Sequence, residues 1–225
     1  MLHEPVLIAG EWRAARDPVD TFQAVDPMTK QPLPAVYPVS SMAETEEAIV
    51  AASEAAEAMR EVAPENLAAF LEAFADNIDA RADEISALAH QETALAVEPR
   101  LRSVELPRTT DQLRQAAAAA RERSWCHATI DVARNIRSMY GPLGGGVVVF
   151  GPNNFPLAFN SVSGGDAAAA LAAGNPVIAK GNTGHPGTTK LLTEAAFDAV
   201  KATGMPKAMV QLLYRTSHET GARLV

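Results

Sequence analysis

The order of apolar and polar positions divides the chain into two regions. Over residues 1–140, after a short hairpin pattern and a proline-rich stretch, apolar positions recur at helical spacing. From residue 141 onward, short β-branched runs alternate with helical segments at intervals of roughly 30 residues, the size of a β-α-β unit. The sequence therefore predicts an α/β protein with an N-terminal helical and hairpin region over 1–140. Residues 141–225 are predicted to form the β-α-β-α-β half of a dinucleotide-binding domain.

The first region opens with two short apolar runs. Val6–Ala9 and Trp12–Ala14 flank Gly10-Glu11, which indicates a β-hairpin because glycine in the turn permits a positive φ. The proline-rich stretch 27–38 that follows is expected to contain edge strands only, since proline donates no hydrogen bond to a sheet.

Four helices are expected after this stretch. Ser41 and Glu44 fit a capping box at the start of the first helix, and Pro64 suits the first turn of the second. Apolar positions around Ile85 indicate a third helix. Thr110–Arg123 is predicted as the fourth, because its alanine run has strong helix propensity.

Three apolar runs in the second region predict strands buried on both faces of a sheet. They are Val147–Phe150, Val177–Ala179 and Met209–Leu213. A helix is expected from Pro156 to about Ala173, and another ends before Gly204. Right-handed crossovers make the three strands parallel, and ligands of such open sheets bind at the carboxyl ends of the strands.

Composition narrows the classes of function. The formal net charge of −8 disfavours nucleic acid and anionic membranes as partners. The N-terminal residues contain no apolar run long enough for a signal peptide, and no segment is long enough to span a bilayer. The expected location is therefore cytoplasmic. The histidines show no metal-ligand spacing, so no metal site is expected.

The single thiol is predicted to be incidental. Cys126 excludes an intramolecular disulfide, which fits a reducing compartment. His127 is its neighbour, but adjacent residues of a helix or strand point in different directions. We therefore do not interpret Cys126 as a nucleophile.

Four glycines near residue 141 do not form a phosphate-binding loop. The dinucleotide fingerprint G-x-G-x-x-G follows a strand and opens a helix, whereas Gly141, Gly144, Gly145 and Gly146 precede the strand. They are interpreted as a flexible entry to it. The absence of the fingerprint disfavours an unrelated doubly wound reductase.

The segment after the first parallel strand, Gly151–Pro156, is the first candidate site. The side-chain amide of Asn154 in this segment can donate a hydrogen bond to a developing oxyanion. The alternative is that Asn154 only caps the following helix, a position that asparagine favours. Spacing alone does not decide between the two.

Lys180, at the end of the second parallel strand, is the second candidate. Many dinucleotide-binding domains have an acidic residue there that holds the adenosine ribose, but none occurs between Lys180 and His185. Lys180 and Thr183 are therefore predicted to hold a ribose, including one with a 2′-phosphate. The alternative is a lysine at the sheet edge that extends its amine into solvent.

Several of these segments together resemble the aldehyde dehydrogenase superfamily, over essentially the whole chain. The matching segments are Val148–Phe159, Gly164–Asp166, Ala172–Val177, Lys180–Thr188, Ile8–Trp12, Asp26–Thr29 and Gln91–Thr93. The nearest branch contains NADP-linked fatty-aldehyde and 2-oxoglutarate-semialdehyde dehydrogenases. The resemblance implies an aldehyde-dehydrogenase-like fold that is truncated after the first half of a Rossmann-like parallel sheet.

The resemblance also implies roles for individual residues. Asn154 matches the asparagine of the family's oxyanion hole, and Lys180 matches the lysine on the adenosine ribose. Thr183 stands where NAD-preferring members often have a glutamate, which implies NADP, or NAD, as the cofactor. The other residues that the resemblance places at the cofactor are Pro152, Asn153, Arg215, His218 and Gly221.

The family's nucleophilic cysteine, its general-base glutamate and an oligomerisation strand match no part of this chain, and by resemblance they lie beyond Val225. The last expected helix, capped by Thr216 or Ser217, has no stop signal, which suggests that the natural domain continues. The resemblance thus implies the N-terminal portion of an NAD(P)-dependent enzyme that oxidises an aldehyde to a carboxylic acid. The full-length form is expected to be a homo-oligomer and this chain alone to be inactive. The alternative is a catalytically silent nucleotide-binding or interaction module.

Overall fold

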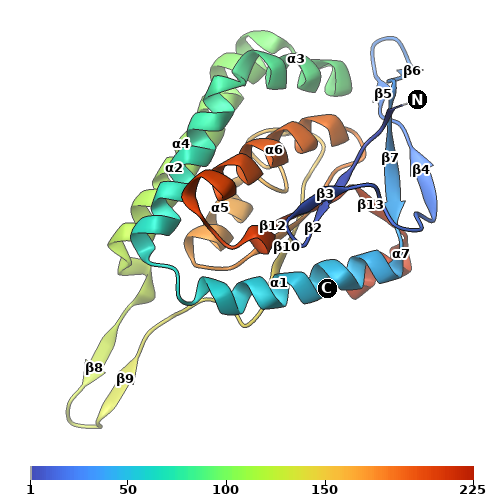
Figure 1. Ribbon diagram of the computed structural model, residues 1–225. Helices are drawn as coiled ribbons and strands as arrows, with labels where there is room; N and C mark the ends of the chain where they lie inside the picture. Colours follow the sequence, from blue (N-terminus) through green and yellow to red (C-terminus); the bar gives the residue numbers. More distant parts are fainter. Residues whose placement is uncertain (1) are drawn as a thin grey trace.

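Three parallel strands form one side of the main sheet, and their parallel pairing is as predicted. The computed structural model describes residues 2–225. Its strands β10 (Val147–Phe150), β11 (Val177–Lys180) and β12 (Val210–Leu213) pair in parallel and in register. The N-terminal hairpin of β2 (Val6–Ile8) and β3 (Glu11–Arg13) extends the sheet in the order β10-β11-β12-β2-β3 (Figure 1). The hairpin thus covers the edge of β12, while within residues 2–225 no strand pairs with the outer edge of β10.

The hairpin turn lies one residue earlier than expected. Ala9 and Gly10 form it, with φ of 53° and 77°, and Ile8 pairs with Glu11. Positive φ at both central residues suits the right-handed twist of the strands. Glycine is required at the second position, because a Cβ on Gly10 would lie 2.4 Å from Cβ of Lys207.

A second sheet contradicts the prediction of edge strands in the proline-rich stretch. Its centre is β7 (Ala35–Ser40), which pairs with β1 (Leu2–His3), β4 (Asp20–Phe22) and β13 (Arg215–Thr216). Pro38 is tolerated here because β1 pairs with residues 35–36 and β13 with residues 39–40, so Pro38 falls between them. Two further short strands, β5 (Val25–Asp26) and β6 (Gln31–Pro32), pair only with each other.

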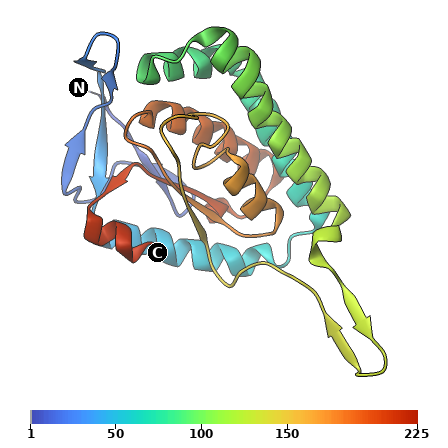
Figure 2. The same cartoon turned by 180° about the vertical axis from the view of Figure 1, so that it is seen from behind.

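Helices cover both faces of the main sheet (Figures 1 and 2). Helix α1 packs on one face, and α5 and α6 pack on the other, with α2 and α4 forming an outer layer over α5 and α6. Cover on both faces explains why β11 and β12 are buried, largely apolar runs. The prediction is wrong for β10, the outer strand, in which only Val149 is buried and Phe150 is 49% exposed. The helices are α1 (Met42–Met59), α2 (Pro64–Ala80), α3 (Ala82–Thr93), α4 (Leu106–Glu122), α5 (Gly165–Ala172), α6 (Pro186–Thr203) and α7 (His218–Arg223).

The starts of two helices differ from the prediction. Ser41 caps α1 by accepting a hydrogen bond from the Glu44 backbone N–H. The Glu44 carboxylate does not complete the capping box, because it accepts from Arg13 and from the Arg16 backbone. Helix α4 begins at Leu106, four residues before Thr110, and it follows a wide helical segment, Val97–Glu105.

The helix expected from Pro156 begins only at Gly165. Residues 151–164 form a loop, and the N-cap of α5 is Gly164. The backbone N–H groups of this loop bind buried side chains. Leu157 N and Ala158 N donate to Glu105, and Val162 N donates to the Asn160 side chain. The correction follows from tertiary contacts, because Glu105 is distant in sequence.

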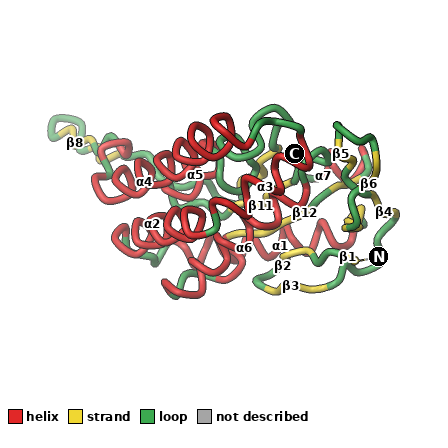
Figure 3. Tube along the Cα trace, turned by 90° about the horizontal axis from the view of Figure 1, so that it is seen from above, coloured by secondary structure: helices red, strands yellow, loops and turns green. Residues whose placement is uncertain are grey.

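A hairpin that the sequence pattern did not indicate extends away from the body. Strands β8 (Thr129–Asp131) and β9 (Ile136–Ser138) pair in antiparallel fashion and protrude beyond α4 (Figures 1 and 3). Several large apolar side chains on and beside it are exposed: Ile130, Val132, Ile136, Met139 and Tyr140. Among residues 2–225 no helix combines the length and the apolar character needed to cross a membrane.

Candidate functional site

Three loops meet where the strands β10, β11 and β12 end. We call this the carboxyl edge of the sheet, as distinct from its outer strands. The Asn182 amide in the loop after β11 donates to the Gly151 carbonyl at 3.0 Å. The two loops are joined a second time, because His185 Nε2 lies 2.9 Å from the Pro152 carbonyl. A carbonyl only accepts, so Nε2 carries the hydrogen. These two contacts fix the start of the loop after β10 against the loop after β11.

A buried carboxylate holds the other end of the loop after β10. Glu105 Oε1 accepts from Leu157 N at 2.8 Å and from Ala158 N at 3.0 Å, while its second oxygen pairs with Arg100. The Glu105 side chain is 1% exposed. A buried carboxylate that receives several hydrogen bonds is rigid, because each lost bond leaves a polar group unpaired. The loop therefore presents Asn153 and Asn154 to solvent from a fixed base.

The structure removes the capping alternative for Asn154. Helix α5 begins eleven residues later, at Gly165, and its N-cap is Gly164. The backbone carbonyl of Asn154 accepts from Arg100 Nη2 at 3.2 Å. Within the described chain its side-chain amide forms no hydrogen bond, and the residue is exposed. The amide is thus available to a ligand oxygen.

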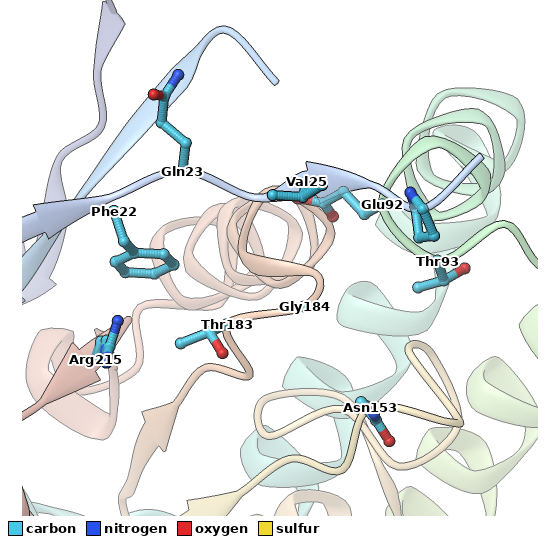
Figure 4. Close-up of a pocket in the computed structure, with 10 residues that line it drawn as sticks. Phe22, Gln23, Val25, Glu92, Thr93, Asn153, Thr183, Gly184 and Arg215 are labelled. Carbon is cyan, nitrogen blue, oxygen red and sulfur yellow. The ribbon is translucent and has the colours of Figure 1, made fainter. Parts of the chain in front are cut away.

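A pocket of about 430 Å³ lies beside this edge. It contains three residues predicted at the cofactor, Asn153, Thr183 and Arg215, and Figure 4 shows Thr183 and Arg215 on the same side of it, near Phe22. The Arg215 guanidinium lies 5.8 Å from the centroid of the Phe22 ring. The remaining lining residues are Gln23, Val25, Pro27, Glu92, Thr93 and Gly184.

Lys180 makes this edge electropositive. It is half-buried at the end of β11, a central strand, where it pairs with Phe150 and Leu213 on either side. The central position of β11 and the half-burial of Lys180 argue against a lysine that extends freely into solvent. Burial, and secondarily the nearby positive charge of Arg215, lower the pKa of the Lys180 amine. Within residues 2–225 no carboxylate lies within 4 Å of the amine, so an anion would relieve the repulsion between Lys180 and Arg215.

Four of the predicted cofactor residues do not line the pocket. Lys180 is one of them and is half-buried at the end of β11. Pro152 is exposed, and its carbonyl is bound by His185. His218 and Gly221 lie on the short helix α7, which follows β13. His218 is exposed, and a Cβ added at Gly221 would lie 3.2 Å from Thr216 Oγ1.

Cys126 lies at the opposite ends of the same strands, the amino edge of the sheet. It is free and buried, and it shares a cavity of about 160 Å³ with Gly141 and Gly174, which precede β10 and β11. These residues lie at the amino ends of the strands, away from Asn154 and Lys180. The interpretation of Cys126 as an incidental thiol stays a prediction. In the part of the chain that is described, no cluster of three His, Cys, Asp or Glu side chains could hold a metal.

Sequence reasoning missed the buried polar residues that fix the loops. Besides Glu105 and His185, these include Glu92, whose carboxylate accepts from Gly187 N and Thr188 N at the start of α6, at 2.8 Å each. Burial raises the pKa of Glu92 to about 7, against the effect of these hydrogen bonds. The available signal was an acidic residue within a buried helical pattern, which is rare unless the charge is paired.

Comparisons with known proteins agree with this fold. The sequence profile of the Aldehyde dehydrogenase family matches residues 12–225, and the chain belongs to that family. It is 41% identical over 217 residues to alpha-ketoglutaric semialdehyde dehydrogenase 2 of Azospirillum brasilense, a match that covers 91% of this chain and 40% of that protein. A second relative, the alpha-ketoglutaric semialdehyde dehydrogenase of Acinetobacter baylyi, is 37% identical over 133 residues, 54% of this chain and 24% of that protein.

Solved structures show the same fold. HpcC from Thermus thermophilus superimposes with a TM-score of 0.81 at 26% identity, over 98% of this chain and 41% of that one. A Thermus 1-pyrroline-5-carboxylate dehydrogenase with bound NAD gives a TM-score of 0.83 at 24% identity, over 99% and 41%. The chain therefore spans about two fifths of the length of these relatives.

Proposed function

We propose that this chain is the N-terminal portion of an NAD(P)-dependent aldehyde dehydrogenase that oxidises an aldehyde to a carboxylic acid. The observation that carries the proposal is the free amide of Asn154, held at the carboxyl end of β10 by Glu105 and His185. Ligands of open α/β sheets bind at this edge. In such a reaction the aldehyde oxygen acquires negative charge when a thiolate attacks the carbonyl carbon, and a fixed amide donor stabilises that charge.

The chain's own residues supply binding and orientation. Asn154 Nδ2 would donate to the aldehyde oxygen, and the rigid loop keeps that donor in place as the charge develops. The dinucleotide supplies the hydride acceptor when bound. Cys126 is the single cysteine of the sequence, and it lies at the opposite ends of the strands from Asn154. We therefore expect no turnover from these 225 residues alone.

For the cofactor, the residues present fit the adenosine half of NADP. Lys180 and Arg215 are close enough for their charges to interact, Thr183 adds a hydroxyl, and no carboxylate stands between Lys180 and His185. A 2′-phosphate carries nearly two negative charges and three acceptor oxygens at neutral pH. The proposal is that the site prefers NADP to NAD or accepts both. His218 and Gly221 are proposed to contribute from α7.

The class of aldehyde is suggested by the names of the two relatives, both alpha-ketoglutaric semialdehyde dehydrogenases. Such a semialdehyde has a carboxylate at one end and an aldehyde at the other. We include an aldehyde acid of this class in the proposal.

Dinucleotide titration tests the proposal directly. The purified chain should bind NADP by calorimetry, and Lys180→Met should weaken that binding by roughly tenfold or more, the equivalent of one charge-assisted hydrogen bond. Lys201→Met, which removes an exposed lysine from α6 paired with Asp198, is the matched control. Absence of dinucleotide binding in the unmodified chain would reject the cofactor site. Steady aldehyde turnover by the chain alone would show that the nucleophile has been misassigned, and Cys126→Ala would identify whether Cys126 is responsible.

The competing function is a catalytically silent nucleotide-binding module. Both forms would bind dinucleotide, so the mass of the protein in its native source distinguishes them. A polypeptide of the relatives' length supports the dehydrogenase, and a native product of 225 residues supports the silent module.

We also propose that the full-length form is a homo-oligomer. The β8–β9 hairpin exposes apolar side chains well away from the body, with Ile130 74% and Val132 87% exposed, and within the described residues β10 leaves one edge of the main sheet open. Exposed apolar surface and open strand edges favour association. Sedimentation should therefore show oligomers or aggregates, and Ile130→Ser with Val132→Ser should reduce them. A monomeric wild-type chain would contradict this part of the proposal.

A further inference from the structure

Two arginines lie against the aromatic rings that follow Asn154. The Arg100 guanidinium carbon is 4.6 Å from the centroid of the Phe155 ring. Arg108 lies 4.9 Å from the Phe159 centroid and 6.0 Å from that of Phe155. The two rings meet edge to face, with their centroids 5.0 Å apart. One cluster thus combines an apolar surface with two cationic groups from different elements.

The charge of this cluster is incompletely neutralised. Arg100 pairs with Glu105, but that carboxylate also accepts two backbone N–H groups. Arg108 is exposed, and within residues 2–225 no carboxylate lies within 4 Å of its guanidinium. Arg108 lies in the first turn of the 17-residue helix α4, and that turn contains no acidic residue. Arg108 therefore has no anionic partner among the described residues and is free to bind one.

The cluster adjoins the proposed oxyanion donor. Arg100 Nη2 donates to the backbone carbonyl of Asn154 at 3.2 Å, and Phe155 is the next residue along the chain. Arg100 is 30% exposed and Phe159 37% exposed, so a small molecule can reach both. Planar guanidinium groups bind carboxylates with two parallel hydrogen bonds, and their stacking on aromatic rings orients them for this.

We propose that Arg108, with Arg100, forms a subsite for the carboxylate of an aldehyde acid whose aldehyde group lies at Asn154. Phe155 and Phe159 would contact the methylene chain between the two ends. This inference rests on the proposed function, because it takes Asn154 as the donor to the reacting oxygen. It makes Arg108 a residue that selects a charged aldehyde over a neutral one of the same length.

The test uses the 225-residue chain with valerate as the charged probe and pentanamide as its neutral counterpart. Binding is followed by NMR through the arginine Nε–H and phenylalanine ring signals. Valerate should shift the signals of Arg108, Phe155 and Phe159, and pentanamide should bind at least about tenfold more weakly. Equal binding of the two probes would overturn the proposal, since a stacked arginine with only a structural role does not distinguish them.

Substitutions localise the effect. Arg108→Gln should weaken valerate binding about tenfold and leave pentanamide unchanged, and Arg108→Lys should lose part of the affinity because lysine lacks the paired donors. The matched control is Arg114→Gln, which removes an exposed arginine of the same helix paired with Asp76 and Asp79. An equal loss with Arg114→Gln would reduce the effect to net charge and overturn the proposal.

NADP titration of the same samples separates the two proposals. If valerate and pentanamide bind equally well while NADP still binds, the carboxylate subsite is rejected and the cofactor site is retained. Discrimination between the probes without NADP binding would reject the proposed cofactor site and retain the subsite.

Discussion

The two ends of the same three parallel strands have different chemistry. At the carboxyl end, Lys180 and Asn154 lie among loops tied by buried polar contacts. At the amino end, Cys126 lies in a small cavity beside the glycines that enter the strands. Cys126 has the most nucleophilic side chain by residue type, but it lies at the amino ends of the strands, away from the candidate binding residues. Under the proposed function, position relative to strand direction separates the candidate residues from Cys126 better than residue type does.

The difference has a structural cause. Each strand of the parallel sheet is followed at its carboxyl end by a loop that leads into a helix start, and helix starts have free N–H groups and a positive dipole. Glu92 satisfies such groups at the start of α6, and Glu105 satisfies those of the loop before α5. These carboxylates fix the loops at the carboxyl ends of the strands. Cys126 is held by backbone hydrogen bonds instead: its carbonyl accepts from Tyr140 N at 2.8 Å, and its N–H donates to the Arg123 carbonyl at 3.0 Å.

The largest expected effect comes from removing a carboxylate that fixes the carboxyl edge. Glu105→Ala leaves Leu157 N and Ala158 N buried without an acceptor, which should lower the free energy of unfolding by about 1–3 kcal/mol for each N–H. Urea denaturation measures it, with Glu122→Ala, an exposed position at the end of α4, as control. If the two variants are equally stable, the loop is not held in this way.

A smaller effect is expected on the choice of cofactor. Thr183→Glu places a carboxylate beside the proposed 2′-phosphate, so the Kd for NADP should rise by roughly tenfold or more while that for NAD changes little. Calorimetry with both dinucleotides measures the ratio, and Thr129→Glu on the distant β8 is the control. An equal change for NAD and NADP, or clearly tighter NAD binding in the unmodified chain, would remove Thr183 from the 2′ position.

The contact between the two loops should make stability depend on pH. Burial lowers the pKa of His185, opposed by its hydrogen bond to Pro152, so the unfolded chain binds the proton first as the pH falls below about 6.5. The stability that neutral His185 contributes to the folded chain is thus fully present above that pH, and it declines as the pH falls below it. Unfolding free energies of wild type and His185→Gln, measured from about pH 7.5 to about pH 5, should converge as the pH falls. A constant difference between them would contradict this.

The smallest effect on ligand binding is expected at the amino edge. Cys126→Ala should cost about 1 kcal/mol of stability through lost packing and leave the Kd for NADP unchanged. Calorimetry and urea denaturation of the same sample measure both quantities. A weaker NADP complex would show that the two edges are coupled.

The sequence predicted the parallel strands and the helices that cover them, because apolar periodicity reports local structure and burial. It failed where a distant residue competes with a local preference. Pro156 suits a helix start, but Glu105 and Asn160 bind the following backbone donors, and the helix starts at Gly165. Pro38 predicts an edge strand, but it lies in the central strand of the second sheet. It is tolerated there because β1 and β13 pair with β7 on either side of Pro38 and not at Pro38 itself.

The candidate site divides in the same way. The sequence by itself determined that Asn154, Lys180 and Thr183 lie at the carboxyl edge of a parallel sheet, because strand direction follows from the β-α-β order. Only the tertiary structure decided that the Asn154 amide is free, that Arg215 is close to Lys180, and that Arg108 faces Phe159. The last two relations join residues that are 35 and 51 positions apart in the chain. Their distances depend on how helices pack on the sheet, which no local pattern encodes.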